Sequence, residues 1–136
     1  MPLMSRKGIL AIAAVIDVAV HAHGRPVSAK ALAARHKLPP RHLEPVLQAL
    51  VRDGILKGVR GPHGGYELAR ERKRITAEDI LRAAGSAEEA GEPPLPGSAL
   101  VKDVVKPALV EAERIFSAAL GRINVEDMAK LAETLK

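Results

Sequence analysis

A glycine-rich turn between two short strand-like segments constrains the fold of this 136-residue chain more than any other feature. Ile55–Val59 is typical of a strand, Arg60–Gly65 holds three glycines and a proline, and Tyr66–Leu68 alternates as a returning strand. Glycine and proline adopt the backbone angles that tight turns need. The pattern therefore predicts a β-hairpin, and a basic run follows it at Arg70, Arg72, Lys73 and Arg74.

The first of three helices predicted before this hairpin lies in the apolar run of residues 9–20. Helical spacing predicts that its buried face consists of Ile9, Ile12, Ala13, Ile16 and Val20. Basic residues precede the run as in a signal peptide, but Asp17 interrupts it and no small-residue cleavage site follows. The run is too short to span a bilayer. We therefore expect a buried helix in a cytoplasmic protein.

The second and third predicted helices are joined by a tight connector, Lys37–Pro40. Ser28 is a good N-cap for a helix that ends at His36, with Leu32 and Ala33 facing inward. The third helix is expected to start as late as residues 42–44 and to stop at Asp53–Gly54. Its single apolar face is predicted to contain Leu43, Val46, Leu47, Leu50 and Val51.

The segment after the hairpin carries a fourth helix start, a loop and a long helix. Thr76 and Asp79 form a capping box, and Ile75 and Ile80 form its hydrophobic staple. Residues 85–97 are predicted to be a loop, residues 98–122 a long helix that Pro107 kinks or shortens, and residues 125–135 a last short helix.

The long helix has more apolar surface than so small a domain can cover. We expect it to form a dimer interface, the alternative being an ordinary core helix. The expected dimerisation residues are Val101, Val105, Ala108, Ala112, Ile115, Phe116 and Ala119.

Charge is divided unevenly along the chain. Residues 1–82 hold 15 Lys and Arg against 7 Asp and Glu, whereas residues 83–136 hold 6 against 9. A basic N-terminal part suggests a module that binds a polyanion. With only Tyr66 and Phe116 as aromatics, recognition by base stacking is not expected.

Several kinds of chemistry are not expected from this sequence. The chain has no cysteine, which excludes disulfides, thiolate zinc sites and cysteine-held iron–sulfur clusters. The five histidines are scattered without a supporting acidic cluster, so no metal site and no cofactor is expected. No nucleophile elbow, phosphate loop or zinc-protease motif is present, and we do not expect an enzyme.

Three short helices followed by a hairpin predict a winged helix-turn-helix, a mainly α fold with a small β-hairpin wing, here followed by a long C-terminal dimerisation helix. The outward face of the third helix is predicted to enter the major groove of DNA. Phosphate contacts are expected from the second helix, from the start of the third and from the basic run, and Arg60 at the wing tip suits the minor groove. The expected DNA-binding residues are Ser28, Lys30, Arg41, His42, Glu44, Gln48, Arg52, Arg60, His63 and Tyr66.

Three segments of the chain resemble the Rrf-two family of bacterial transcription regulators, the group of IscR, NsrR and CymR. Residues 59–70 (VRGPHGGYELAR) are similar to the family's wing, residues 42–47 (HLEPVL) to its recognition helix, and residues 75–80 (ITAEDI) to the segment after the wing. The likeness is strongest over residues 1–84. It implies a homodimer that binds a roughly palindromic operator, usually as a repressor.

The resemblance also assigns roles and shows two departures. Arg41 and Glu44 fall where family members read bases, and Arg60 where the wing enters the minor groove. Pro45 stands where some members have a base-reading glutamine, so the operator sequence does not carry over. The loop that holds three cluster-binding cysteines in sensor members has none here, so sensing through an iron–sulfur cluster is not supported.

The expected organisation is a DNA-binding domain at 1–84, a linker at 85–97 and a helical dimerisation region at 98–136. The expected partners are double-stranded DNA and a second copy of the chain, with no membrane. An effector, either a protein or a small molecule, is not identified by the residues. The alternative function is a winged-helix adaptor that binds protein without contacting DNA.

Overall fold

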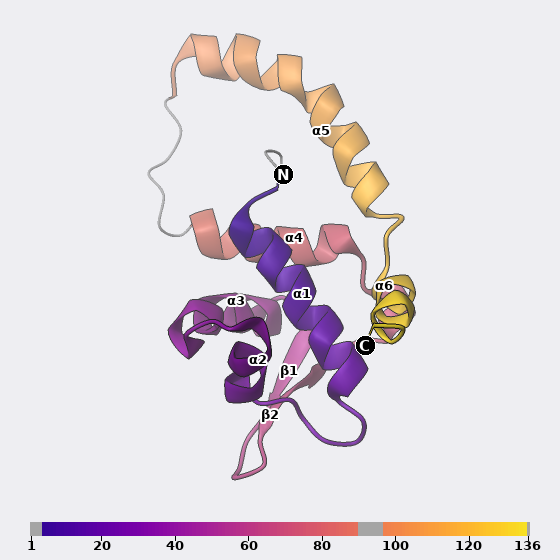
Figure 1. The fold of residues 1–136 in the computed structure, drawn as a ribbon. Coiled ribbons are helices and arrows are strands. Elements are labelled where there is room, and N and C mark those ends of the chain that lie inside the picture. Colours follow the sequence, from indigo (N-terminus) through magenta and orange to yellow (C-terminus); the bar gives the residue numbers. More distant parts are fainter. Residues whose placement is uncertain (1–3, 90–96, 136) are drawn as a thin grey trace.

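The computed structural model describes residues 4–89 and 97–135 of the chain. It contains helices α1 (Arg6–His21), α2 (Ala29–His36) and α3 (Pro40–Arg52), a hairpin of β1 (Leu56–Val59) and β2 (Gly65–Leu68), a 3₁₀ turn η1 (Arg72–Arg74), and helix α4 (Ala77–Glu89). A π-helical segment η2 (Leu100–Val105), helix α5 (Lys106–Leu120) and helix α6 (Val125–Ala132) complete the described chain. The fold is the predicted one, mainly helical with one small hairpin (Figure 1).

Helix α1 lies at the centre of the body and packs on α3, α4, α6 and β2. The buried residues of the helix are Gly8, Ala11, Ala14, Val15, Asp17, Val18 and Ala19. The predicted face was therefore wrong: Ile9 is exposed, and Ile12, Ala13, Ile16 and Val20 lie half-buried at the edge of the core. The run is apolar on nearly all sides, so it has no unique stripe, and small alanine side chains let neighbouring helices approach closely.

Helices α2 and α3 follow the predicted helix-turn-helix pattern. The hydroxyl of Ser28 accepts a hydrogen bond from the Ala31 amide at 3.0 Å, which caps α2. Lys37 turns the chain in the left-handed region, with φ of 54°. Helix α3 then begins at Pro40, earlier than expected, because the first turn needs no amide hydrogen from proline.

The buried face of α3 contains Leu43, Val46, Leu47, Ala49 and Leu50. Val51, the last residue of the predicted stripe, was assigned wrongly and is 37% exposed. It lies one residue before the helix ends, where the chain turns away from the core. Gly54, with φ of 75°, makes that turn as expected.

The hairpin strands pair antiparallel, with Leu56 opposite Leu68 and Val59 opposite Gly65. Helix α4 begins with the predicted capping box, in which Thr76 and Asp79 exchange two hydrogen bonds of 3.1 Å each. The end of α4 differs from the prediction. The helix continues to Glu89 and so includes residues 85–89, for which the sequence predicts a loop. Residues 90–96 of that predicted loop lie outside the described residues.

The C-terminal helices differ in how they are packed. Helix α5 rises away from the body, and neither η2 nor α5 has a buried residue (Figure 1). Pro107 lies in the first turn of α5, where the π-helical segment passes into the α-helix. Helix α6 instead returns to the body, where Val125 and Ala129 join the core beside α1. None of the helices within residues 4–89 and 97–135 combines the length and apolar character needed to cross a membrane.

Candidate nucleic-acid interface

The outward face of α3 presents polar side chains that the rest of the chain leaves uncovered. Arg41, His42, Glu44, Gln48 and Arg52 are all exposed, opposite the buried leucines of the same helix. The helix is rigid because that apolar face is fixed in the core. A rigid helix with one exposed polar face is the element that a DNA major groove accommodates.

The hairpin is fixed beside α2 by a short extra pairing. The Val27 amide donates to the Tyr66 carbonyl at 2.9 Å, and the Tyr66 amide donates to the Val27 carbonyl at 2.8 Å. Gly65 permits this approach, because a Cβ there would lie 2.4 Å from the Val27 carbonyl oxygen. Arg60 and His63, in the connection between the strands, are exposed. The wing therefore extends from a defined position next to the start of α2.

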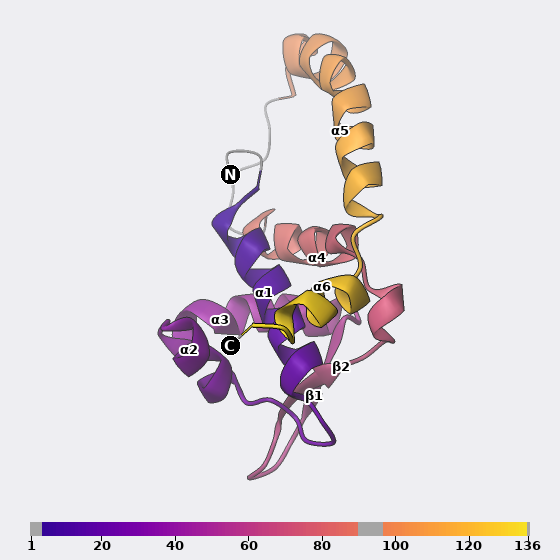
Figure 2. The ribbon, with the colours of Figure 1, turned by 45° about the vertical axis from the view of Figure 1, so that its right-hand side comes forward.

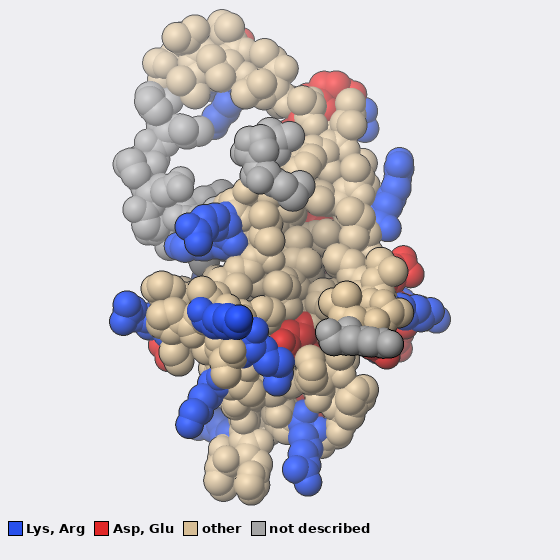
Figure 3. Space-filling view, viewed as in Figure 1, with Lys and Arg blue, Asp and Glu red and all other residues tan. Residues whose placement is uncertain are grey.

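Both ribbon views place α2, α3 and the hairpin at one end of the molecule and α5 at the other (Figures 1 and 2). Between the wing and the start of α2 lies a groove of about 800 Å³. Its charged and titratable lining residues are His21, Arg25, Arg35 and His63, and no Asp or Glu lines it. Figure 3 shows Lys and Arg side chains projecting around α2 and the hairpin. Because Arg35 is paired with Asp17, Arg25 is the groove's available Lys or Arg side chain for contact with a polyanion.

The remaining predicted residues have mixed environments. Lys30 is exposed on α2, near the cap. Ser28 is half-buried and its hydroxyl oxygen already accepts the capping hydrogen bond. Tyr66 is half-buried against the core, so its ring helps to hold the wing.

Most of the basic run after the hairpin makes contacts within the chain. Arg70 donates to the carbonyls of Gly54 and Asp53 at 3.1 Å, which caps the end of the α3 region. Arg72 donates to Glu133 at 2.8 Å and lies 3.8 Å from Glu126, so it ties η1 to α6. This hydrogen bond lowers the pKa of Glu133. Arg70 and Arg72 are thus held by contacts within the chain, which makes them weaker candidates for phosphate contacts than the sequence indicates.

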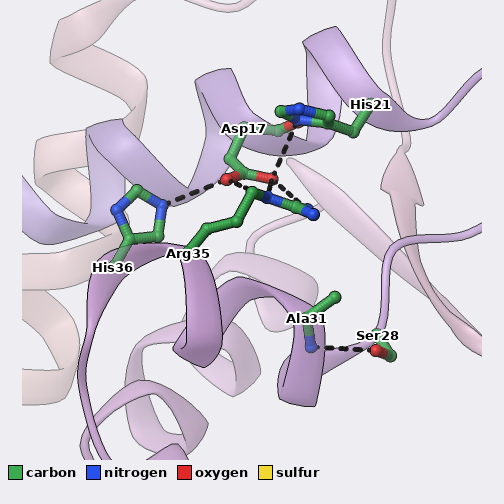
Figure 4. Close-up of polar contacts among 6 residues, drawn as sticks. All are labelled: Asp17, His21, Ser28, Ala31, Arg35 and His36. Atoms are coloured by element: carbon green, nitrogen blue, oxygen red, sulfur yellow. Dashed lines mark hydrogen bonds and ion pairs between the residues drawn. The ribbon is translucent and has the colours of Figure 1, made fainter.

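Sequence reasoning missed a polar cluster between α1 and α2 (Figure 4). Asp17 of α1 accepts hydrogen bonds from Arg35 of α2, at 2.9 Å from Nε and 2.6 Å from Nη2. His36 Nε2 lies 3.2 Å from the same carboxylate and His21 Nδ1 lies 3.3 Å from it. The hydrogen bonds to Asp17 raise the pKa of the Arg35 guanidinium above its ordinary value, so Arg35 keeps its charge. The sequence signal that could have indicated this cluster is a charged residue, Asp17, inside an apolar run.

The cluster does not make a metal centre. Across residues 4–89 and 97–135, no three His, Asp or Glu side chains are arranged to hold a metal ion. The guanidinium of Arg35 occupies the position next to the Asp17 carboxylate that a cation would need.

Helix-turn-helix, wing and exposed recognition face together define a winged helix-turn-helix protein. A family model described as an iron-dependent transcriptional regulator, Rrf2, matches residues 4–131. The chain therefore belongs to the Rrf2 family, as the resemblance of its wing and recognition helix indicated. The family and the relatives below are transcriptional regulators and not enzymes.

Individual relatives agree with this assignment. The chain is 31% identical to IscR of Xenorhabdus nematophila, over 97% of this chain and 82% of that protein. It spans about half the length of several other curated relatives. Its fold is similar to T. potens IscR, with a TM-score of 0.73 and 32% identity over 98% of this chain and 91% of that one. It is also similar to CymR, the global cysteine regulator of B. subtilis, with a TM-score of 0.69 and 27% identity over 94% and 96% of the two chains.

Proposed function

We propose that this protein is a homodimeric transcription regulator that binds a roughly palindromic DNA operator and acts as a repressor. One observation carries the proposal. Arg41, His42, Glu44, Gln48 and Arg52 are exposed together on α3, and among the described residues none of them makes a side-chain hydrogen bond or ion pair. A helix face whose donors and acceptors are exposed and not engaged within the chain fits the base edges of a major groove.

Different parts of this surface would contact different parts of the DNA. Arg41 and Glu44, near the start of α3, would contact base edges, while Lys30 and the cationic groove beside α2 would contact phosphates. Arg60 would enter the narrow minor groove, whose negative potential attracts a guanidinium. The chain contains no cysteine, so a signal reaches it by some route other than a cysteine-held cluster, through a protein or a small molecule.

A second copy of the chain would cover α5. None of the seven predicted dimerisation residues is buried in the single chain, and Leu109 is exposed beside them on the same helix. Ala108, Ala112 and Ala119 are small enough for two helices to approach closely along this face. A twofold dimer would repeat α3 and the wing at a spacing of one or more turns of the duplex.

Replacing Arg60 tests the DNA-binding surface. Arg60→Ala is expected to weaken binding to a duplex selected from random-sequence DNA by about 5- to 100-fold, the usual effect of losing one groove-reading arginine. Fluorescence anisotropy measures the affinity and thermal melting checks the fold. Lys106→Ala, which removes one exposed positive side chain from α5 at the opposite end of the molecule from the wing, is the control and should change the affinity little. An Arg60→Ala protein with unchanged melting and unchanged affinity would contradict the proposal.

A further inference from the structure

Asp17 is the only buried charged residue among the residues that the structure describes. It is 8% exposed on a helix whose other buried residues are apolar or glycine. Burying a carboxylate costs free energy, and a well-packed apolar residue at such a site is often as stable or more stable. Stability alone therefore does not explain an ion pair at this position.

The geometry of the pair fixes an orientation. The fork of Arg35 binds the Asp17 carboxylate through both Nε and Nη2, with additional contact from Nε to the second oxygen at 3.2 Å (Figure 4). A two-point contact between planar groups sets angle as well as distance. His21 and His36 flank the carboxylate and complete its surroundings.

The pair joins the body of the molecule to its recognition unit. Asp17 belongs to α1, which packs on α4 and α6. Arg35 lies in the last turn of α2, two residues before Lys37 redirects the chain into α3. Helix α3 packs directly on α1, α2 and α4, whereas α2 makes few close backbone approaches to α1. The ion pair is thus placed to control how α2 lies against α1 and, through the connector at Lys37, how the start of α3 is oriented.

We propose that Asp17 and Arg35 are a positioning pair, which holds α2 and α3 at the angle needed to discriminate between DNA sequences. The inference rests on the proposed function, since it concerns the same surface. The pair sets how well α3 fits base edges and leaves the phosphate contacts, which depend on charge rather than angle, largely unchanged.

Arg35 also lines the groove beside the wing, so a direct phosphate contact is the competing explanation. The two roles predict different results for Arg35→Lys. Lysine keeps the positive charge that a phosphate contact needs but lacks the planar fork that binds Asp17 at two points. Positioning therefore predicts a loss of discrimination with an unchanged salt dependence of binding.

The test compares the full-length protein with two variants, Arg35→Lys and the double variant Asp17→Leu with Arg35→Met. Each is measured for its affinity to a duplex selected by the wild-type protein and to a random-sequence duplex, over a range of salt concentrations. Both variants are expected to lower the ratio of the two affinities by about 10-fold or more. Regulators typically bind their specific sites about 10³- to 10⁷-fold more tightly than non-specific DNA, so such a loss would leave part of the specificity intact. The double variant should melt near the wild-type temperature or above it, because an apolar pair replaces a buried ion pair.

Three outcomes would overturn the inference. Unchanged affinities for both duplexes in a folded double variant would mean that the pair only stabilises the fold. Unfolding of the double variant together with an unchanged ratio in Arg35→Lys would mean the same. Equal weakening on both duplexes in the double variant, with a smaller salt dependence and normal discrimination, would assign Arg35 to phosphate binding. If the wild-type protein bound neither duplex, the proposed function itself would fail. If the wild-type protein bound DNA and the variants kept its discrimination, only this inference would fail.

Discussion

Ile115→Glu is expected to convert the proposed dimer to a monomer at micromolar concentration. Ile115 is 57% exposed in the single chain, so a charge there costs the isolated chain little. In a dimer the same charge would be buried without a partner in both copies, which typically costs 2–5 kcal/mol or about 30- to 4,000-fold in affinity. Sedimentation equilibrium measures the change, and binding to a two-half-site duplex should weaken with it.

Val110→Glu is the matched control for this experiment. Val110 is 58% exposed and lies on the same helix, but on the side opposite to the predicted seam. Both variants replace an exposed aliphatic residue with glutamate, so they differ only in which face of α5 carries the charge. We expect Val110→Glu to remain dimeric. A stable Ile115→Glu dimer, or equal dissociation of both variants, would show that the predicted seam is not the interface.

Gly65→Ala is expected to displace the wing and lower DNA affinity by at least about 10-fold, because Arg60 would lose its proposed groove contact. The added Cβ would meet the carbonyl oxygen of Val27 at 2.4 Å and the amide nitrogen of Ser28 at 2.8 Å. Both are backbone atoms, so no side-chain rotation relieves the overlap. Separation of the two segments would break the Val27–Tyr66 pairing and cost about 1–3 kcal/mol, seen as a lower melting temperature.

Gly58→Ala controls for the loss of a glycine in the hairpin. Gly58 faces Tyr66 across the same two strands, and a Cβ there meets no atom within 4 Å. This variant should melt and bind DNA like the wild-type protein. Amide exchange at Val27 and Tyr66 reports the pairing directly and should accelerate only in Gly65→Ala. Slow exchange at both amides in Gly65→Ala would contradict the account of the wing.

The sequence predicted the fold where a single physical pattern dominated a segment. In α3 the apolar residues Leu43, Val46, Leu47 and Leu50 occupy one face of a helix whose other face is polar, so the buried side was unambiguous. The capping box at Thr76 and the glycine-rich wing were equally local signals. The buried face of α1 was missed because that helix is apolar almost all round, and only its neighbours decide which side is covered.

Long-range polar contacts could not be predicted from the sequence. Arg72 resembles a phosphate-binding residue in a basic run, yet its acceptor Glu133 lies 61 residues further along the chain. Asp17 and Arg35 are separated by 18 residues, and only the packing of α2 beside α1 brings them together. Counting charged residues gives only the net charge of a segment. The structure determines which charged side chains are paired within the chain and which remain exposed to bind a partner.

The central claim is that the face formed by α3, the start of α2 and the wing binds duplex DNA through a cationic surface. The most direct measurement is the affinity of the wild-type protein for a selected duplex between 50 and 200 mM salt. A surface that neutralises about 6–10 phosphates should lose ~10³–10⁵ in affinity over this range, because bound counterions are released on association. Absence of duplex binding at 50 mM salt, or an affinity that does not change with salt, would contradict the claim and favour an adaptor that binds protein.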